Sequence, residues 1–168
     1  SRGAGARSGA AAPRAAGEHG VTKLKEFIDA LDDARIVAAI HAAESRTRAE
    51  IRVHVSRREA ADARRSGAAA FEKLGMTATT ERNGVLIFLA PASRSFAVLG
   101  DASIHERCGD EFWTRVASAM SGHFREGRFS DGLVAGIAAV GSELARHFPR
   151  REGDADRNEL PDTVSRDE

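Results

Sequence analysis

The segment GVLIFLA (residues 84–90) is apolar at every position, and this feature constrains the fold more than any other part of the chain. A strand with one solvated face alternates apolar and polar residues, because successive side chains point to opposite faces. A strand without that alternation has both faces covered, as in sheets that carry helices on each side. The segment therefore predicts a central strand in a layered α/β domain.

Two more strands are expected around this segment. EIRVHVS (residues 50–56) alternates, with Ile51, Val53 and Val55 on one buried face. SFAVLG (residues 95–100) follows the turn PASR, which predicts an antiparallel hairpin with residues 84–90. The segment EAADARRSGAAAFEKLG (residues 59–75) indicates a helix that ends near Gly75. The first two strands are then parallel and joined by a right-handed crossover.

Three further segments show helical spacing of apolar residues. Residues 32–45 carry such a face, with Asp32 or Asp33 as N-cap. Residues 110–127 and 130–148 each place apolar residues three or four positions apart. The predicted order is helix, strand, helix, strand, strand, helix, helix. The fold class is therefore α/β, a three-layer α/β/α sandwich with a small mixed β-sheet flanked by helices on both faces.

The 168 residues fit one domain with irregular ends. Residues 1–21 are rich in Gly, Ala and Arg, and residues 150–168 are polar and mostly acidic, so both ends are expected to be disordered or linkers around a domain of residues 22–149. Lys+Arg and Asp+Glu both number 25, a balance that argues against a nucleic-acid partner.

The sequence contains neither a membrane span nor a signal peptide. No apolar stretch approaches the roughly 20 residues that cross a bilayer, and the first residues lack a hydrophobic core segment. The sequence also begins without Met. We expect a soluble, cytoplasmic chain, or an extracytoplasmic one if an upstream signal or anchor was removed.

The predicted topology brings polar residues to one edge of the sheet. The third strand runs back along the second, so its end lies beside the starts of the first two. The turn before the first strand leads into the same edge. We call this edge the rim, and its polar residues are Glu44, Thr47, Glu50, Arg82, Asn83 and Asp101.

Four strings of the sequence, in this order, resemble the TPM domain, a family named for thylakoid-lumen, photosystem II repair and acetylcholine-receptor-modulator proteins. They are AIHAAESRTRAEIRVHV, FEKLGMTATTERNGVLIFLAP, VLGDASIHERCGDEFW and FREGRFSDGLVAGIAAVGSELARHFP. The resemblance covers roughly residues 34–149 and implies a three-layer α/β/α domain. It also implies acid phosphatase activity, as in plant members, divalent cation binding, as in some members, or a role in assembling membrane protein complexes.

The chain departs from the pattern of that family at two positions. Ala49 replaces the common glycine before the strand-opening glutamate, and Ser103 replaces a glycine two residues after Asp101. Both changes keep the carboxylates but alter loops where a ligand would lie.

Asp101 is the first candidate for chemistry at the rim. It follows Gly100, so its side chain suits an N-cap of the next short helix. It also suits a catalytic or metal-binding role, with Glu50 as the second carboxylate of a Ca²⁺ or Mg²⁺ site. Arg82 either neutralises one of these acids or binds a phosphate group.

Glu44, Thr47 and Asn83 are the remaining candidate binding residues. Thr47 suits a local hydroxyl turn. Asn83 precedes Gly84, where a positive φ would give a tight turn into the strand.

Other chemistries find little support. His105 and Cys108 lie one helical turn apart without a second pair, so zinc is not expected. The residue six after Cys108 is Thr114, not the arginine of a cysteine phosphatase. The lack of a GxGxxG or Walker loop excludes a nucleotide cofactor.

Two hypotheses remain. The first is a TPM-domain module that binds a cation or an unknown protein partner in an assembly. The alternative is a divalent-cation-assisted acid phosphatase acting on a small phosphorylated ligand, in which a metal at Asp101 and Glu50 activates water. Whether the chain is an enzyme, even a weak phosphatase, stays open at this point.

Overall fold

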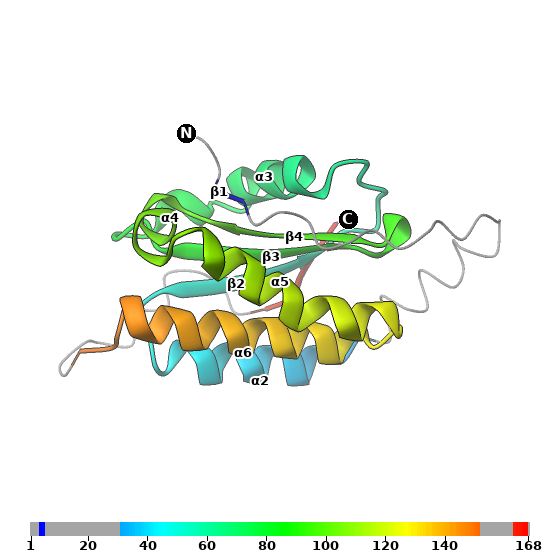
Figure 1. The fold of residues 1–168 in the computed structure, drawn as a ribbon. Coiled ribbons are helices and arrows are strands. Elements are labelled where there is room, and N and C mark those ends of the chain that lie inside the picture. The colour runs from blue at the N-terminus through cyan, green and yellow to red at the C-terminus, as the bar shows by residue number, and fades with distance from the viewer. Residues whose placement is uncertain (1–3, 6–30, 152–162, 168) are drawn as a thin grey trace.

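A computed structural model describes residues 4–5, 31–151 and 163–167. Within these residues, a five-stranded mixed sheet in the order β1-β4-β3-β2-β5 forms the middle layer (Figure 1). The strands are β1 (Ala4–Gly5), β2 (Glu50–Val55), β3 (Gly84–Ala90), β4 (Ser95–Gly100) and β5 (Ser165–Arg166). β2 runs parallel to β3, and β4 runs antiparallel to β3, as the sequence predicts.

Helices cover both faces of the sheet. Helix α3 packs on one face, while α2, α5 and α6 pack on the other, and α4 lies at one end (Figure 1). Their bounds are α2 (Asp33–Glu44), α3 (Ala63–Lys73), α4 (Ala102–Cys108), α5 (Asp110–Arg125) and α6 (Phe129–His147), with short 3-10 turns η1 (Met76–Ala78) and η2 (Pro91–Ser93). The predicted three-layer α/β/α fold is confirmed.

The helix ends follow from local sequence. Asp32 caps α2, its carboxylate accepting the Arg35 amide at 3.1 Å, and Asp62 caps α3 in the same way. The chain leaves α3 through Gly75, whose φ of 68° suits a residue without a side chain. These caps fix where each helix meets the sheet.

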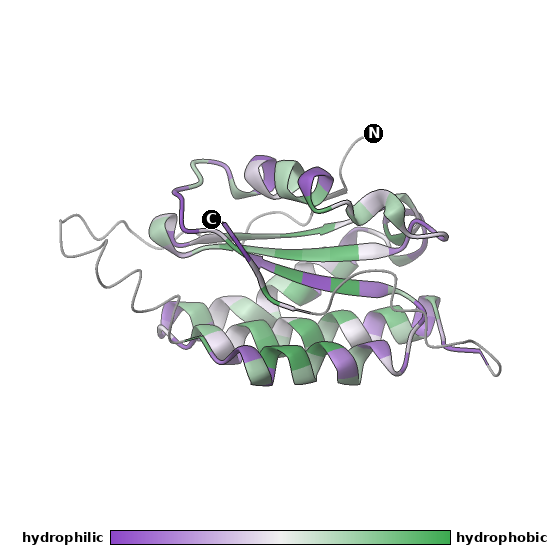
Figure 2. Cartoon of the chain, turned by 180° about the vertical axis from the view of Figure 1, so that it is seen from behind, coloured by the Kyte–Doolittle hydropathy of each residue, from purple (hydrophilic) through white to green (hydrophobic). Residues whose placement is uncertain are grey.

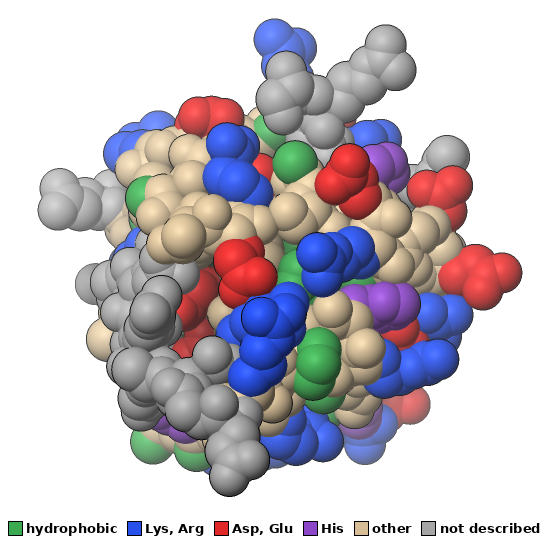
Figure 3. Space-filling view, turned by 90° about the vertical axis from the view of Figure 1, so that its left-hand side faces the viewer, with side chains coloured by type: hydrophobic (Ala, Val, Ile, Leu, Met, Phe, Trp, Pro, Cys, Tyr) green, Lys and Arg blue, Asp and Glu red, His purple; other side chains and the backbone are tan. Residues whose placement is uncertain are grey.

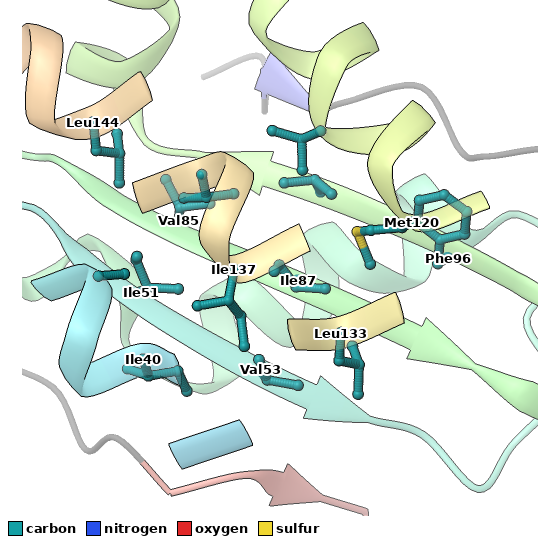
Figure 4. Close-up of a cluster of buried hydrophobic side chains, with 14 of the residues drawn as sticks. Ile40, Ile51, Val53, Val85, Ile87, Phe96, Met120, Leu133, Ile137 and Leu144 are labelled. Atoms are coloured by element: carbon teal, nitrogen blue, oxygen red, sulfur yellow. The ribbon is translucent and has the colours of Figure 1, made fainter. Parts of the chain in front are cut away.

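Two hydrophobic clusters hold the layers together. The larger lies between the sheet and α2, α5 and α6, and includes Ile51, Ile87, Met120 and Ile137 (Figure 4). The smaller lies under α3 and includes Phe71 and the alternate residues of β3 and β4. All seven residues of β3 are buried, which is why GVLIFLA contains no polar position.

Strand β2 alternates along its length. Ile51, Val53 and Val55 join the larger cluster, while Arg52 and His54 belong to the other face. Figure 2 shows this alternation of hydrophilic and hydrophobic residues along β2, next to the more evenly hydrophobic inner strands. The sheet therefore becomes more polar toward its β2 edge.

The predicted boundaries of 1–21, 22–149 and 150–168 stay predictions, because most of both ends lies outside the described residues. Two short parts of these ends are described. Ala4–Gly5 pairs with β4, and Ser165–Arg166 pairs with β2, where the sequence analysis expected no ordered structure.

Two glycines give a matched test of this packing. A Cβ at Gly100 would lie 2.4 Å from Trp113 Cη2 and 2.8 Å from Ile104 Cγ2, whereas a Cβ at Gly122 would meet nothing within 4 Å. We expect Gly100→Ala to lower the free energy of unfolding by about 1–3 kcal/mol through overpacking. Gly122→Ala, at an exposed position of α5, should instead raise the free energy of unfolding by about 0.5–1 kcal/mol, because alanine favours the helix.

Chemical denaturation of both variants, with an unchanged denaturant slope, measures these effects. Equal tolerance of alanine at the two positions would contradict the close approach of β4 to α4 and α5.

Candidate functional site

The rim forms at the sheet edge where the sequence analysis expected it. Glu50 pairs with Gly84, and Gly100 pairs with Val85, so the starts of β2 and β3 meet the end of β4. The Asp101 amide donates to the Gly84 carbonyl at 2.9 Å. Arginine and acidic side chains gather at this end of the molecule (Figure 3).

Asp101 is held by two structural interactions. Its Oδ1 accepts the Ala102 amide at 2.8 Å, which caps α4. Arg82 donates to both carboxylate oxygens, from Nε at 2.7 Å and from Nη2 at 3.0 Å. Asp101 is only 5 % exposed, so the carboxylate is enclosed with a guanidinium against it. The cap and the salt bridge, both predicted as alternatives to catalysis, are confirmed.

Arg82, the partner of Asp101, has an unusual backbone conformation. Its φ is 53°, in the left-handed region that residues with side chains rarely adopt. The expectation of a positive φ at Gly84 is wrong: Gly84 already lies in β3, and the turn is made two residues earlier. The hydrogen bond to Asp101, followed by its charge, raises the pKa of Arg82. Half of the Arg82 side chain remains exposed to solvent.

Asn83 lies just inside the rim and is almost fully buried. Its backbone amide donates to Thr79 Oγ1 at 3.1 Å, and its side-chain Nδ2 donates to the Arg48 carbonyl at 3.3 Å. Its Oδ1 is buried and has no hydrogen-bond partner in the part of the chain that the structure describes. Buried oxygens of this kind are normally satisfied, so this atom marks a place that suits a water or a cation.

The two glutamates of the rim differ in role. Glu44, at the end of α2, accepts the Ile51 amide at 2.9 Å through Oε2 and so covers the start of the outer edge of β2. Glu50 is 3 % exposed, and its amide donates to the Asn83 carbonyl at 3.4 Å. Strand β3 lies between Glu50 and Asp101, which separates their backbones by roughly 10 Å.

Thr47 joins the rim to the end of α6. Its hydroxyl lies 2.6 Å from the Phe148 carbonyl and 3.2 Å from that of Leu144, and it accepts the Ala49 amide at 3.1 Å. The last of these contacts is the local hydroxyl turn that the sequence analysis expected. Thr47 is 2 % exposed, so it holds two elements together and offers little to a ligand.

Two arginines of the rim were missed in the sequence analysis. The guanidinium carbons of Arg48 and Arg107 lie 5.6 and 5.0 Å from the centre of the Phe148 ring. Arg48 also donates through Nε to both carboxylate oxygens of Glu81 at 2.9 Å. The only sequence signal was an arginine beside the first strand and another on the helix after Asp101, which does not reveal their common contact.

The structure also describes the surroundings of Cys108 and of the residue types that bind metal ions. No group of three or more His, Cys, Asp or Glu residues among those described is arranged to hold a metal ion. Burial, followed by the charge of Glu143, raises the pKa of the Cys108 thiol to about 11. Cys108 is therefore protonated at neutral pH and a poor nucleophile.

The fold and the rim together define a TPM domain. The sequence model of that family, described as the TPM domain, matches residues 21–143, and the chain belongs to this family. A solved relative is the BA42 protein from the psychrophilic bacterium Bizionia argentinensis, whose NMR structure superposes with a TM-score of 0.74. It is 38 % identical in sequence, over 80 % of this chain and 92 % of that chain.

None of the curated proteins gives a significant match to the chain. Among the helices of the described residues, none combines the length and apolar character needed to cross a membrane.

The structural role of Asp101 leads to a stability prediction. Asp101→Ala removes the cap of α4 and the partner of Arg82, and should lower the free energy of unfolding by about 1–2 kcal/mol. Asp101→Asn should cost less, because its side-chain oxygen can still accept the Ala102 amide. Denaturation curves measure both, with Glu106→Ala on the exposed face of α4 as the control. Full stability of Asp101→Ala would show that the enclosed carboxylate contributes nothing to the fold.

Proposed function

We propose that this TPM domain is a binding or assembly module that acts through its rim, rather than a catalyst. The observation that carries the proposal is the state of Asp101, whose carboxylate is enclosed between the Ala102 amide and the Arg82 guanidinium. A general acid or a metal ligand needs a carboxylate oxygen open to the reacting group. Here Oδ1 accepts two hydrogen bonds and Oδ2 accepts one, and the residue is only 5 % exposed, so little of the carboxylate is open to a ligand.

The rim has the composition of a surface that contacts a protein. Arg82 is half exposed, Arg107 is exposed, and Arg48 and Arg107 lie over the Phe148 ring. Arginine is enriched at protein interfaces, because its planar group packs on rings and donates several hydrogen bonds at once. Glu81 beside Arg48 adds opposite charge, so the surface favours a partner that carries both signs.

The alternative is an acid phosphatase that uses a divalent cation at Asp101 and Glu50. The family resemblance supports it, and the rim does gather both acids and Arg82 at one sheet edge. For this chemistry Arg82 would have to release Asp101 and bind the phosphate instead. A metal there would polarise a phosphoryl oxygen and supply hydroxide.

A phosphatase assay separates these two functions. With Mg²⁺ or Ca²⁺ present, we expect no sustained hydrolysis of a generic aryl phosphate by the full chain, and the same trace rate from Asp101→Asn and Glu50→Gln. The reason is that neither carboxylate is presented to a substrate in the proposed module. Hydrolysis that persists over many turnovers and disappears in a folded Asp101→Asn chain would overturn the proposal.

A cation is a second candidate ligand of the rim, favoured by the buried Oδ1 of Asn83. Amide and carboxylate oxygens suit Ca²⁺ and Mg²⁺, so Asn83 would hold the ion, with Glu50, whose backbone amide bonds to the Asn83 carbonyl, as the carboxylate from the neighbouring strand, rather than Asp101. At the rim such an ion would tie the start of β2 to the start of β3, whose backbones already pair.

Thermal melting tests this assignment. We expect Ca²⁺ to raise the melting temperature of the full chain, because binding adds RT ln(1 + [L]/Kd) to the free energy of unfolding, about 2.7 kcal/mol at a hundredfold excess over Kd. Glu50→Gln should lose most of the rise, while Asp101→Asn should keep it. An unchanged midpoint at millimolar Ca²⁺ and Mg²⁺, with KCl as the ionic-strength control, would remove the cation from the proposal.

A further inference from the structure

The outer edge of β2 carries a short segment from the far end of the sequence. Residues 163–167, which we call the docked segment, place β5 parallel to β2, with His54 opposite Ser165 and Val55 opposite Arg166. β5 lies beside β2 at the edge of the sheet away from β3 (Figures 1 and 4). This edge is the only side of β2 that β3 leaves open for pairing.

Four residues of the docked segment, Val164 to Asp167, make side-chain contacts with the rest of the domain. Ser165 Oγ lies 3.0 Å from His54 Nδ1, and Asp167 Oδ1 lies 2.8 Å from His54 Nε2. Asp167 Oδ2 accepts the Ser56 hydroxyl and, at 3.0 Å, the Arg57 amide. Burial raises the pKa of Asp167, but the hydrogen bonds from Ser56 and His54 outweigh burial, and the net shift is downward. The carboxylate is therefore charged at neutral pH.

The other two contacts are an ion pair and an apolar anchor. Arg166 donates to both oxygens of Asp33, from Nη1 at 2.8 Å and from Nη2 at 2.6 Å. Val164 packs against the larger hydrophobic cluster. Asp33 lies in the first turn of α2, so the docked segment contacts both the outer edge of β2 and the start of α2.

The docked segment makes many side-chain contacts but little strand pairing. Four successive side chains, in the order Val, Ser, Arg and Asp, all make contacts, Ser165 and Asp167 to the two ring nitrogens of His54, while the strand pairing involves only two residues. Toward the rim, Glu44 already accepts the Ile51 amide, which ends the open edge there. A short, sequence-specific strand on an open edge is the geometry of peptide recognition by strand addition.

We propose that this edge is a peptide-binding site and that the docked segment is its resident occupant, exchanged for an extended segment of a protein partner with an apolar residue, a hydroxyl residue, an arginine and an aspartate in succession. The site lies at the opposite end of β2 from the rim, so it is independent of the function proposed above.

Tethering favours a partner over a second copy of the chain as the occupant of this site. A segment tethered in the same chain acts at an effective concentration of about millimolar, so an identical segment on a dilute second copy does not displace it. A partner displaces it by presenting the same chemistry with more contact, for example a longer apolar stretch next to Val164. His54 and Asp33 then supply the specificity, because His54 binds a hydroxyl and a carboxylate, and Asp33 binds an arginine.

Peptide titration of the labelled full chain tests the proposal. The probe is a synthetic peptide, NELPDTVSRDE, with the sequence of residues 158–168. The receiving chain carries Arg166→Ala and Asp167→Ala, which removes its own contacts at the site. We expect saturable shifts of the His54, Val55 and Ser56 amide signals, and an apparent Kd about tenfold weaker in the unaltered chain, where the docked segment competes.

Three comparisons make the test specific. Adding Asp33→Asn to the receiving chain should weaken binding about tenfold, because the ion pair to the peptide arginine is lost. Glu106→Ala on α4 should leave binding unchanged. A peptide of scrambled sequence should give no shifts at β2.

The contrary results are equally clear. Absence of shifts at β2 with millimolar peptide, or shifts indifferent to scrambling and to Asp33→Asn, would overturn the site. A wild-type chain that dimerises with rising concentration, and loses this when Arg166 and Asp167 are replaced, would assign the edge to a second copy and overturn the partner. Should the double variant fail to fold, a receiving chain with Arg166→Ala alone takes its place, because it lacks only the ion pair to Asp33.

Discussion

The pairing of β3 with a parallel strand on one side and an antiparallel strand on the other is the constraint on which the rest of the structure depends. β3 is buried along its whole length, so it needs helices above and below, and those helices create the two hydrophobic clusters. The mixed pairing also decides where polar groups can lie. The starts of β2 and β3 and the end of β4 meet at one edge, and the rim exists for that reason.

At the rim, where strands and helices start and stop, many backbone groups need hydrogen-bond partners, and the side chains of the rim supply several of them. Asp101 accepts the first amide of α4, Glu44 accepts the Ile51 amide, and Thr47 bonds the last carbonyls of α6. Polar residues at strand ends therefore have a structural task before they have a chemical one. From sequence alone, a carboxylate that caps a helix or pairs with an arginine looks the same as a catalytic one, because both follow directly after the end of a strand.

The sequence predicted the layers, the strand order and the location of the rim, because these follow from the apolar pattern of segments such as residues 84–90 and 50–56. It did not predict how the side chains of the rim pair. Arg82 contacts Asp101 from a backbone with a positive φ, which no local sequence pattern predicts. Likewise, residues 163–167 form a short and mostly polar segment. Its contacts are with His54 and Asp33, more than a hundred positions earlier in the sequence. Contacts between distant segments of low hydrophobicity leave no periodic trace.

Strand β2 links the two surfaces that this structure presents. Its first residue lies at the rim, and its last residues hold the docked segment, so one strand of six residues connects both ends of the sheet. The face that carries Arg52 and His54 is polar, whereas β3 beside it is apolar throughout. A strand that only supported the core would not need a histidine with both ring nitrogens engaged by another segment. The alternation in EIRVHV thus meets two requirements on one strand: an apolar face that builds the domain, and a polar face whose histidine holds residues 165 and 167 at the outer edge.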